Sequence, residues 1–304
     1  MKDLIIGGAA NYSWSELKYW VNSIKRCGFT GDIVIVATNI TTETLEKLQS
    51  VGVTAFVYGE KDTTGTYRST DQTAPHVQRF IYLWNFLDVL KEKYRYVIVT
   101  DTRDVVFQTN PSEYLSKHCI NKQLIASSEG LAYKDEPWGN QNLYQTFGPF
   151  LHDKLKDSLI HNVGTIAGQF DYVKDLLLMI FQMSLNRPIS VVDQAVYNFL
   201  INQKPYNDLL HYTTNRDSWA IQLGTTRSAI ESGAGDIGIM AKQDPTVLKK
   251  YLEAYQDTQP IIDAHIVKTE QGVPYCIVHQ YDRIDSLKPL VLQEYDDKSN
   301  GDNK

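Results

Sequence analysis

The first hundred residues alternate between strand-like and helix-like segments, and this alternation limits the fold more than any other feature of the chain. Short, β-rich apolar runs occupy residues 3–8, 32–37 and 54–58. Amphipathic segments suited to helices lie between them, at residues 16–27 and 42–49. Strand–helix–strand repeats of this kind form right-handed crossover units and a parallel sheet. The sequence therefore predicts an α/β fold whose mixed, mainly parallel sheet is flanked by helices.

The next segments extend this pattern with a long helix and a buried strand. Residues 60–73 are polar without apolar periodicity, which predicts a loop, and Pro75 then opens a helix expected to reach about Tyr94. The apolar run at residues 96–100 has the composition of a central strand that is buried on both faces. Later segments are expected to form a strand at 123–127, a polar aromatic stretch at 133–147, helices at 170–184 and 192–201, short strands at 219–223 and 275–279, and a polar tail at 296–304.

Composition narrows the class of partner. At 304 residues and 42% hydrophobic content, the chain has enough apolar material for one large domain, expected to span residues 1–295. A formal charge of −6 gives no electrostatic reason to expect a nucleic-acid partner. Three widely spaced cysteines outside any metal pattern suggest reduced thiols and a cytoplasmic protein. No apolar run approaches the roughly 20 residues that span a bilayer, so no membrane span is expected.

The sharpest chemical signal is an acidic turn within residues 96–107 (YVIVTDTRDVVF). Asp101 and Asp104 follow the predicted buried strand, and ligands of open α/β sheets bind outside the carboxyl ends of the strands. Hard divalent cations prefer carboxylate oxygens and often share their remaining sites with substrate phosphates. The turn therefore predicts a metal that bridges a diphosphate. The alternative is structural, with Asp101 capping a turn and Asp104 pairing with Arg103.

This turn resembles the acidic DxD motif of GT-A glycosyltransferases, which pass a sugar from a nucleotide diphosphate to an acceptor. In that motif the third position is acidic, whereas here it is Arg103 and the second carboxylate follows at Asp104. The resemblance implies a GT-A, Rossmann-like fold and a Mn²⁺ or Mg²⁺ ion. Asp101 and Asp104 would hold the ion directly, or the second carboxylate would reach it through a water molecule. Alternatively, Arg103 would itself neutralise the diphosphate.

Two further segments are similar to the nucleotide side of the same superfamily. Residues 7–12 (GGAANY) follow the first strand, where GT-A enzymes lay the base and ribose, although any turn after a strand uses glycine. Arg79 lies three residues after His76 on the predicted helix and suits phosphate contact, with a surface salt bridge as the alternative. The donor contacts implied in this part of the chain are Gly8, Ala9, Asn11, Tyr12, Arg79, Thr102 and Arg103.

Segments in the second half resemble the sugar side of retaining GT-A enzymes, notably family 8. Residues 161–168 (HNVGTIAG) match an Asn-x-Gly segment that contacts the donor sugar, which implies Asn162 and Gly164. Residues 191–197 (VVDQAVY) match an Asp-Gln segment near the anomeric carbon. The implied polar groups at the reacting carbon are Asp193, Gln194 and Glu129, although an aspartate such as Asp193 also favours the start of a helix. Trp138 or Tyr133 would stack on a sugar face, with packing in the core as the alternative for these rings.

His279 ends a β-like run near the carboxyl end of the chain and resembles the late histidine that completes the metal shell in many GT-A enzymes. A lone histidine is more often structural, but imidazole binds Mn²⁺-like ions readily. Together with Asp101 and Asp104 it forms the expected set of metal ligands.

The resemblance as a whole implies a metal-dependent glycosyltransferase that uses a nucleotide-diphosphate sugar and a glycan or other hydroxyl acceptor. Residues 1–110 would form the nucleotide-binding half and residues 111–295 the acceptor and donor-sugar half. One alternative is a sugar-phosphate nucleotidyltransferase, which would carry a basic, glycine-rich loop after the first strand, whereas residues 7–12 contain no basic side chain. The other is a non-catalytic nucleotide-sugar-binding protein, which the Arg103 departure keeps open.

Overall fold

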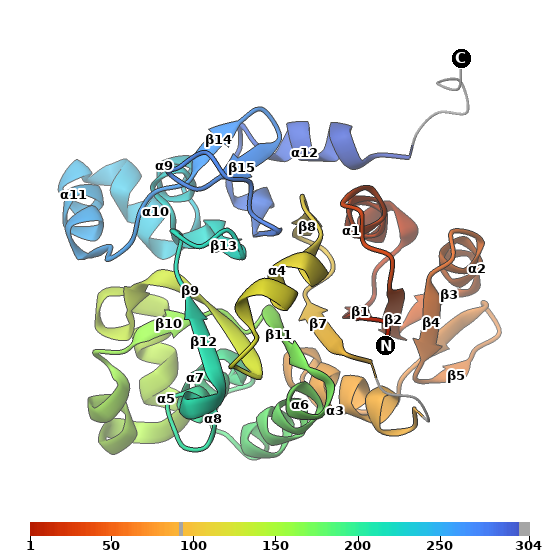
Figure 1. Ribbon diagram of the computed structural model, residues 1–304. Coiled ribbons are helices and arrows are strands. Elements are labelled where there is room, and N and C mark those ends of the chain that lie inside the picture. The colour runs from red at the N-terminus through yellow and green to blue at the C-terminus, as the bar shows by residue number, and fades with distance from the viewer. Residues whose placement is uncertain (91–93, 298–304) are drawn as a thin grey trace.

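A computed structural model describes residues 1–90 and 94–297, and its main feature is an eight-stranded sheet (Figure 1). The central strand β7 (Tyr96–Thr100) is buried at every position and lies between β1 (Leu4–Ala10) and β11 (Thr165–Gln169). Strands β1, β2 (Asp32–Thr38), β4 (Thr54–Val57) and β7 are parallel, whereas β11 runs antiparallel to both β7 and β9 (Leu124–Ala132). The other neighbours of β9 are antiparallel β10 (Leu159–His161) and parallel β12 (Leu210–Thr213). The predicted mixed, mainly parallel sheet flanked by helices is confirmed.

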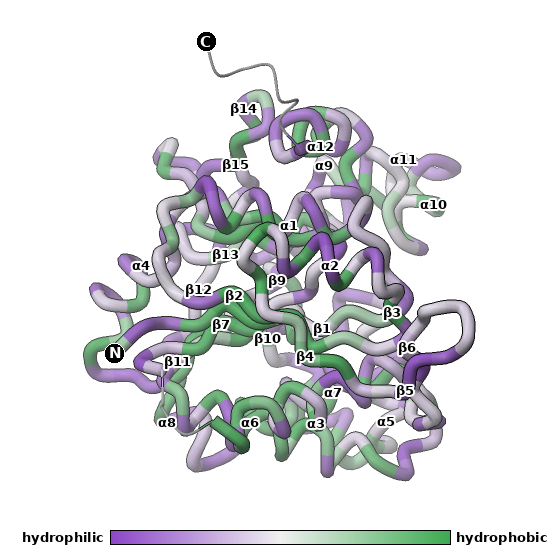
Figure 2. Tube along the Cα trace, turned by 90° about the vertical axis from the view of Figure 1, so that its right-hand side faces the viewer, coloured by the Kyte–Doolittle hydropathy of each residue, from purple (hydrophilic) through white to green (hydrophobic). Residues whose placement is uncertain are grey.

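Both faces of the sheet are covered, which explains why its strands are nearly continuous apolar runs. Alternate residues along β1 enter different cores: Leu4 and Ile6 contact helices on one side, and Ile5 contacts helices on the other. The first side carries α3 (Pro75–Asp88), α6 (Phe170–Ser184) and α7 (Asp193–Ile201). The second carries α1 (Trp14–Arg26), α2 (Thr42–Ser50) and α4 (Pro111–His118), and Figure 2 shows the apolar strands enclosed between these layers.

Local sequence signals account for where the first helices begin. Ser13 and Glu16 form a capping box at the start of α1, and Thr41 accepts a hydrogen bond from the backbone N–H of Thr44 at the start of α2. Such caps satisfy backbone donors that a helix leaves free in its first turn. Pro75 occupies the first turn of α3, where its missing N–H is harmless.

A second, three-stranded sheet joins distant parts of the chain beside the carboxyl end of β7. Its order is β13 (Ala220–Gln222), β16 (Ile277–His279) and β8 (Val105–Phe107), with β8 following the acidic turn directly. The pairing aligns His279 with Val105 on one side and with Gln222 on the other. Residues separated by more than 170 positions in the sequence therefore become neighbours at the end of the main sheet.

The remaining elements surround these two sheets. Two of them follow β9, namely η1 (Tyr133–Asp135) and α5 (Pro137–Leu155), and α8 (Tyr206–Leu209) directly precedes β12. The others follow β13: η2 (Leu223–Thr225), α9 (Arg227–Ser232), α10 (Gly235–Gln243), α11 (Pro245–Ala254), β14 (Ile261–Asp263), β15 (Ile266–Lys268), η3 (Tyr281–Arg283) and α12 (Lys288–Tyr295). Figure 1 shows α9 to α12 on the side of the sheet that carries α1. In the described residues, no helix is both long and apolar enough to cross a bilayer.

Two expectations about local structure were wrong. The expected loop at 60–73 contains β5 (Glu60–Lys61) and β6 (Thr66–Arg68), which pair with each other, and β6 also pairs with β3 (Ile40–Thr41) from an earlier part of the chain. Helix α3 ends at Asp88 instead of near Tyr94, and residues 91–93 lie outside the described part. The aromatic stretch at 133–147, for which no element was predicted, is mostly helical, and Glu136 caps α5 with its side chain. Only part of the expected polar tail, residues 296–297, is described.

Candidate functional site

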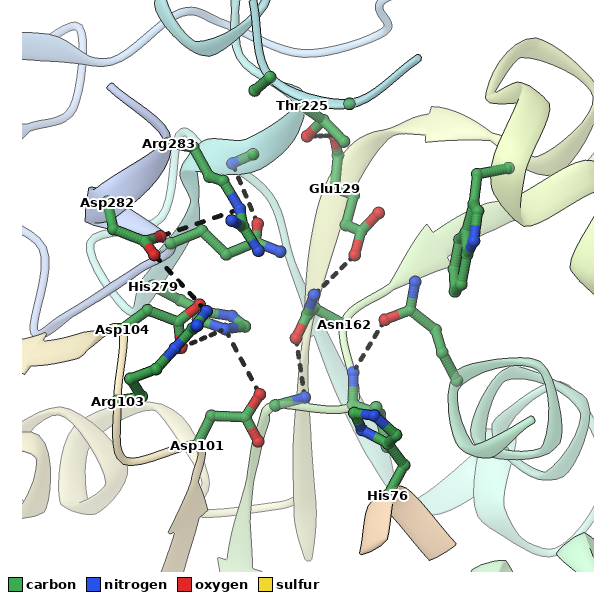
Figure 3. Close-up of a pocket in the computed structure, with 18 of the residues that line it drawn as sticks. His76, Asp101, Arg103, Asp104, Glu129, Asn162, Thr225, His279, Asp282 and Arg283 are labelled. Atoms are coloured by element: carbon green, nitrogen blue, oxygen red, sulfur yellow. Dashed lines mark hydrogen bonds and ion pairs between the residues drawn. The ribbon is translucent and has the colours of Figure 1, made fainter. Parts of the chain in front are cut away.

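A polar cavity of about 850 Å³ opens where β1, β7 and the β10–β11 connection end. Figure 3 shows side chains from both halves of the chain converging in it. The lining contains three guanidinium groups, those of Arg79, Arg103 and Arg283. It also contains seven carboxyl groups: Asp101, Asp104, Glu129, Glu136, Asp193, Asp282 and Asp285. With all seven carboxyl groups ionised and the histidines neutral, the lining carries four more negative than positive charges. Such a surface repels a free diphosphate and attracts a cation.

Asp101, Asp104 and His279 form one compact cluster in this cavity. One ligand atom from each of the three lies within 4.8 Å of the others. The His279 Nε2 atom is 3.6 Å from an oxygen of Asp101 and 3.6 Å from an oxygen of Asp104. The two carboxylates come from the turn between β7 and β8, and His279 ends the strand paired with β8. The predicted set of metal ligands is therefore brought together, through strand pairing that the sequence pattern did not reveal.

Gln222 fixes the orientation of the His279 ring. The His279 Nδ1 atom lies 2.7 Å from Gln222 Oε1, and Gln222 Nε2 donates to Thr165 Oγ1 at 2.9 Å. Because the amide oxygen accepts the Nδ1 proton, Nε2 faces the two carboxylates with its lone pair available in the neutral ring. Burial lowers the pKa of His279, but the negative charges of Asp104 and Asp101 outweigh burial and raise it overall. The same negative potential would favour a divalent cation at this point.

The site fits a small cation, because Gly164 leaves a cradle beside the three ligands. A Cβ atom at Gly164 would lie 2.7 Å from His279 Cε1, 2.8 Å from Asp101 Oδ2 and 2.9 Å from Asn162 Oδ1. These are distances that real Cβ atoms do not adopt, so a larger residue would displace the ligands. Two carboxylates and one imidazole are also a donor set suited to Mn²⁺-like or Mg²⁺-like ions.

Arg79 links Asp101 of this cluster to Asp193. Its guanidinium group forms an ion pair with Asp101 and, at 2.9 Å, a second one with Asp193, which is 4% exposed. Burial lowers the pKa of Arg79, but Asp101 and Asp193 raise it more, so the guanidinium group is held in its charged form. Burial also raises the pKa of Asp193, and the charge of Arg79 opposes this rise. Arg79 is thus a partly buried counter-ion shared by two carboxylates of the cavity, rather than part of the surface salt bridge that was the alternative.

A hydrogen-bonded chain runs from Glu129 to the metal cluster. Asn162 Nδ2 donates to Glu129 Oε1 at 2.7 Å, and Asn162 Oδ1 accepts from the Gly164 N–H at 2.7 Å. The Gly164 carbonyl in turn accepts from the Asp101 N–H at 3.0 Å. Burial raises the pKa of Glu129 to about 7, with the Asn162 hydrogen bond acting in the opposite direction. Gln194 lies beside this chain, where its Oε1 accepts from the Val163 N–H at 3.5 Å.

Arg103, which stands where the acidic motif has a carboxylate, forms ion pairs with Asp104 and Asp282. Its Nη2 atom lies 3.6 Å from Asp104 Oδ2 and 3.5 Å from Asp282 Oδ2, and nearly half of its side chain is exposed to the cavity. Arg283 also lines the cavity, 3.8 Å from Asp282. Sequence reasoning missed both Asp282 and Arg283, although they follow His279 closely in the chain. The signal available was their position directly after a strand that ends in a predicted metal ligand.

Most of the predicted contact residues line the cavity, but three do not. Tyr133, expected as the alternative to Trp138 for sugar stacking, is 1% exposed and packs in the core. Ala9 is buried in the core beneath α1, and Asn11 is exposed outside the cavity. The glycines before them have a structural reason, because a Cβ at Gly7 would lie 2.2 Å from Thr102 Cγ2. Thr102 itself donates its hydroxyl to the Gly8 carbonyl, so its side chain holds the turn. The predicted residues found in the lining are Gly8, Tyr12, His76, Arg79, Asp101, Thr102, Arg103, Asp104, Glu129, Trp138, Asn162, Gly164, Asp193, Gln194 and His279.

Fold and cavity together define an α/β protein with an acid-rich cleft at the carboxyl edge of its sheet. No family model and no curated protein matches the sequence. Among solved structures, the chain is similar to the glycosyltransferase GlyE of Streptococcus pneumoniae TIGR4, with a TM-score of 0.45 and 12% identity over 92% of this chain and 54% of that one. The apo form of GlyE gives a TM-score of 0.46 and 13% identity over the same shares.

Another structural neighbour is glucosyl-3-phosphoglycerate synthase from Mycobacterium tuberculosis, solved with Mn²⁺, uridine diphosphate and glucosyl-3-phosphoglycerate. It gives a TM-score of 0.41 and 12% identity over 70% of this chain and 69% of that one. The chain thus spans about half the length of GlyE.

Proposed function

We propose that this protein is a GT-A-like, metal-dependent glycosyltransferase that transfers a sugar from a nucleotide-diphosphate sugar to a hydroxyl group of an acceptor. The observation that carries this proposal is the cluster of Asp101, Asp104 and His279 at the carboxyl edge of the sheet. Mn²⁺ or Mg²⁺ is the expected ion, because the ligands are two carboxylates and an imidazole. When bound, it would stabilise negative charge on the diphosphate as the bond to the sugar breaks.

The charges of the cavity support a diphosphate ligand only together with a cation. Seven carboxylates would repel two phosphates, and Arg79 is already shared between Asp101 and Asp193. Arg103 and Arg283 pair with Asp282 at 3.5 Å and 3.8 Å, but their side chains are 45% and 43% exposed, so they would contact phosphate oxygens from the cavity wall. Gly8, Tyr12 and Thr102 lie near the start of the cavity, which suits residues 1–110 as the nucleotide-binding half.

The residues of the second half suit the sugar and the reacting carbon. Asp193, Gln194, Glu129 and Asn162 line the cavity, with Asn162 and Glu129 joined by their hydrogen bond. In the reaction, the bond between the anomeric carbon and the phosphate oxygen breaks and its electron pair leaves with the nucleoside diphosphate. The acceptor oxygen forms the new bond to that carbon, and its proton passes to a base, either a carboxylate of the site or the departing phosphate.

The test is incubation of the purified protein with a panel of uridine and guanosine diphosphate sugars, with Mn²⁺, with Mg²⁺ and with chelator. Release of nucleoside diphosphate that requires the metal is the expected result. Formation of pyrophosphate from sugar phosphate and nucleoside triphosphate would instead identify a nucleotidyltransferase. Tight binding of a nucleotide sugar without turnover, with acceptors present, would identify a binding protein.

A further inference from the structure

A second, smaller cavity continues the main one on the side away from Asp101. It has a volume of about 160 Å³, below the ~300–1,000 Å³ of typical pockets for larger ligands, so it suits a single ring. Six of its ten lining residues also line the main cavity: Glu136, Trp138, Gly224, Thr225, Ala234 and Gly235. The two cavities are therefore one continuous space with a metal cluster at one end and a narrower compartment at the other.

Trp138 lines both cavities, and its side chain is only half buried. It is 47% exposed, whereas Trp20 and Trp219 are fully buried. Among the described residues, its indole stacks on no other ring and donates no hydrogen bond. An exposed indole at the mouth of a cavity offers a flat apolar face together with a polar N–H.

The backbone that carries Trp138 is held firmly. Glu136 caps helix α5, and its carboxylate accepts hydrogen bonds from the backbone N–H groups of Trp138 and Gly139. A Cβ at Gly139 would lie 2.8 Å from that carboxylate and 3.1 Å from Ile160, so this first turn is closely packed. The position of Trp138 is thus fixed by the start of the helix, while its ring is left free for a ligand.

The facing wall is made of a short turn and a glycine-containing loop. Thr225 in η2 donates its hydroxyl to the Glu129 carbonyl at 2.7 Å and accepts from Tyr251 through its own carbonyl at 2.7 Å. The connection from α9 to α10 follows, with Gly233 after the end of α9 and Gly235 at the start of α10 at positive φ values of 93° and 61°. Ile230 and Ile237 add apolar surface. This wall links the small cavity directly to Glu129.

The charges of the small cavity disfavour acceptors that carry an anionic group. Its lining contains two carboxylates, Glu136 and Asp236, and neither a lysine nor an arginine. An anionic group placed there would meet like charge without a counter-ion. Carboxylates do accept hydrogen bonds from neutral hydroxyl groups.

We infer that the small cavity is the acceptor subsite and that it binds an uncharged pyranose ring stacked on Trp138. This inference rests on the proposed function. The C–H face of the ring lies on the indole, and its hydroxyl groups are directed to Glu136 and Asp236. A phosphorylated or carboxylated acceptor is disfavoured by the same two carboxylates.

The experiment compares Trp138→Ala, Trp138→Phe and the control Tyr144→Ala, which changes an equally exposed aromatic residue on the same helix, outside both cavities. Binding of methyl pyranosides is followed by saturation-transfer NMR without any donor. Transfer is measured with the same glycosides, with sugar phosphates and with a serine-containing peptide. We expect Trp138→Ala to raise the acceptor KM about tenfold more than the donor KM, with Trp138→Phe recovering most of the loss.

The outcomes separate this inference from the proposed function. NMR contact of neutral pyranosides with the wild-type protein, lost in Trp138→Ala and kept in Tyr144→Ala, supports the subsite even if no donor is turned over. Equal pyranoside binding by Trp138→Ala and the wild-type protein would overturn it. Preferred transfer to sugar phosphates or to the peptide would also overturn it while leaving the glycosyltransferase proposal intact. Circular dichroism confirms that each variant is folded.

Discussion

The two ends of the cavity are built in different ways. At the charged end, Asp104 and His279 are only 10% and 3% exposed at their side chains, and both flank paired strands. At the aromatic end, Trp138 is 47% exposed on the first turn of a helix and faces a turn and a loop. Strand pairing holds each residue against two neighbours, whereas loops accept changes in length and sequence. Under the proposed function, the bond-breaking groups would lie at a turn and a strand end fixed by paired strands, and the acceptor would meet a surface built from a helix start, a turn and a loop.

The largest expected effect comes from removing a carboxylate at the charged end. Asp101→Ala should lower turnover by on the order of 10³-fold or more, because the cation and its charge stabilisation are lost. Asp101→Asn keeps a hydrogen-bond acceptor for Arg79, and its turnover should fall by a similar factor. Asp153→Asn, at an exposed position on α5, is the control. Metal-dependent release of nucleoside diphosphate is the measurement, and retention of wild-type rates in both Asp101 variants would remove the metal role.

Gly164→Ala tests whether the cradle matters without removing a ligand. The added Cβ must displace His279, Asp101 or Asn162, so we expect turnover to fall by about 10²-fold, as small misplacements of catalytic groups do. Titration of Mn²⁺ should show weaker binding in the same variant. A variant with wild-type metal affinity and turnover would show that the three groups can move apart freely and would contradict the rigid description of this end.

Glu129 should make the stability of the metal-free protein depend on pH. Burial raises the pKa of this carboxyl from 4.5 to about 7, with Glu136 adding to the rise and His279 opposing it. Because the folded state binds the proton more tightly, the stabilisation is complete below pH 4.5 and is lost as pH rises through 7. Glu129→Gln keeps an acceptor for Asn162 and stays neutral. Its free energy of unfolding relative to wild type should therefore increase by on the order of 2 to 3 kcal/mol between pH 5 and pH 8.

Denaturant unfolding of both proteins at the two pH values measures this difference. A constant difference between wild type and Glu129→Gln would show that the carboxyl titrates normally, and the buried chain from Glu129 to the cluster would then need revision.

The smallest of these effects is expected at Gln222, which contacts the ring of His279 on the side away from the two carboxylates. Gln222→Leu removes the acceptor for His279 Nδ1, which should weaken metal affinity by about 10- to 100-fold. Gln222→Glu restores an acceptor and should recover most of the affinity. Calorimetric titration with Mn²⁺ compares the variants, and equal affinity in Gln222→Leu and wild type would mean that the imidazole is held by packing alone.

Local patterns predicted much of the fold because they depend on neighbouring residues. The period of apolar residues located α6 at residues 170–184, and the buried run at 96–100 identified the central strand β7. The same reasoning missed β5 and β6, which have few apolar residues and are held by strand pairing, β5 with β6 and β6 with β3. It also extended α3 too far, since the apolar pattern continues past the point where the helix ends at Asp88.

The sequence by itself determined that two carboxylates follow a buried strand, because strand length and apolar composition are local properties. It also indicated which later residues have the right chemistry, among them His279. Only the tertiary structure decided that His279 meets Asp104, that Gln222 orients it and that Gly164 leaves room beside it. These contacts depend on the pairing of β8, β13 and β16, which come from three distant parts of the chain. Such pairings are set by the packing of the whole sheet, and no local pattern encodes them.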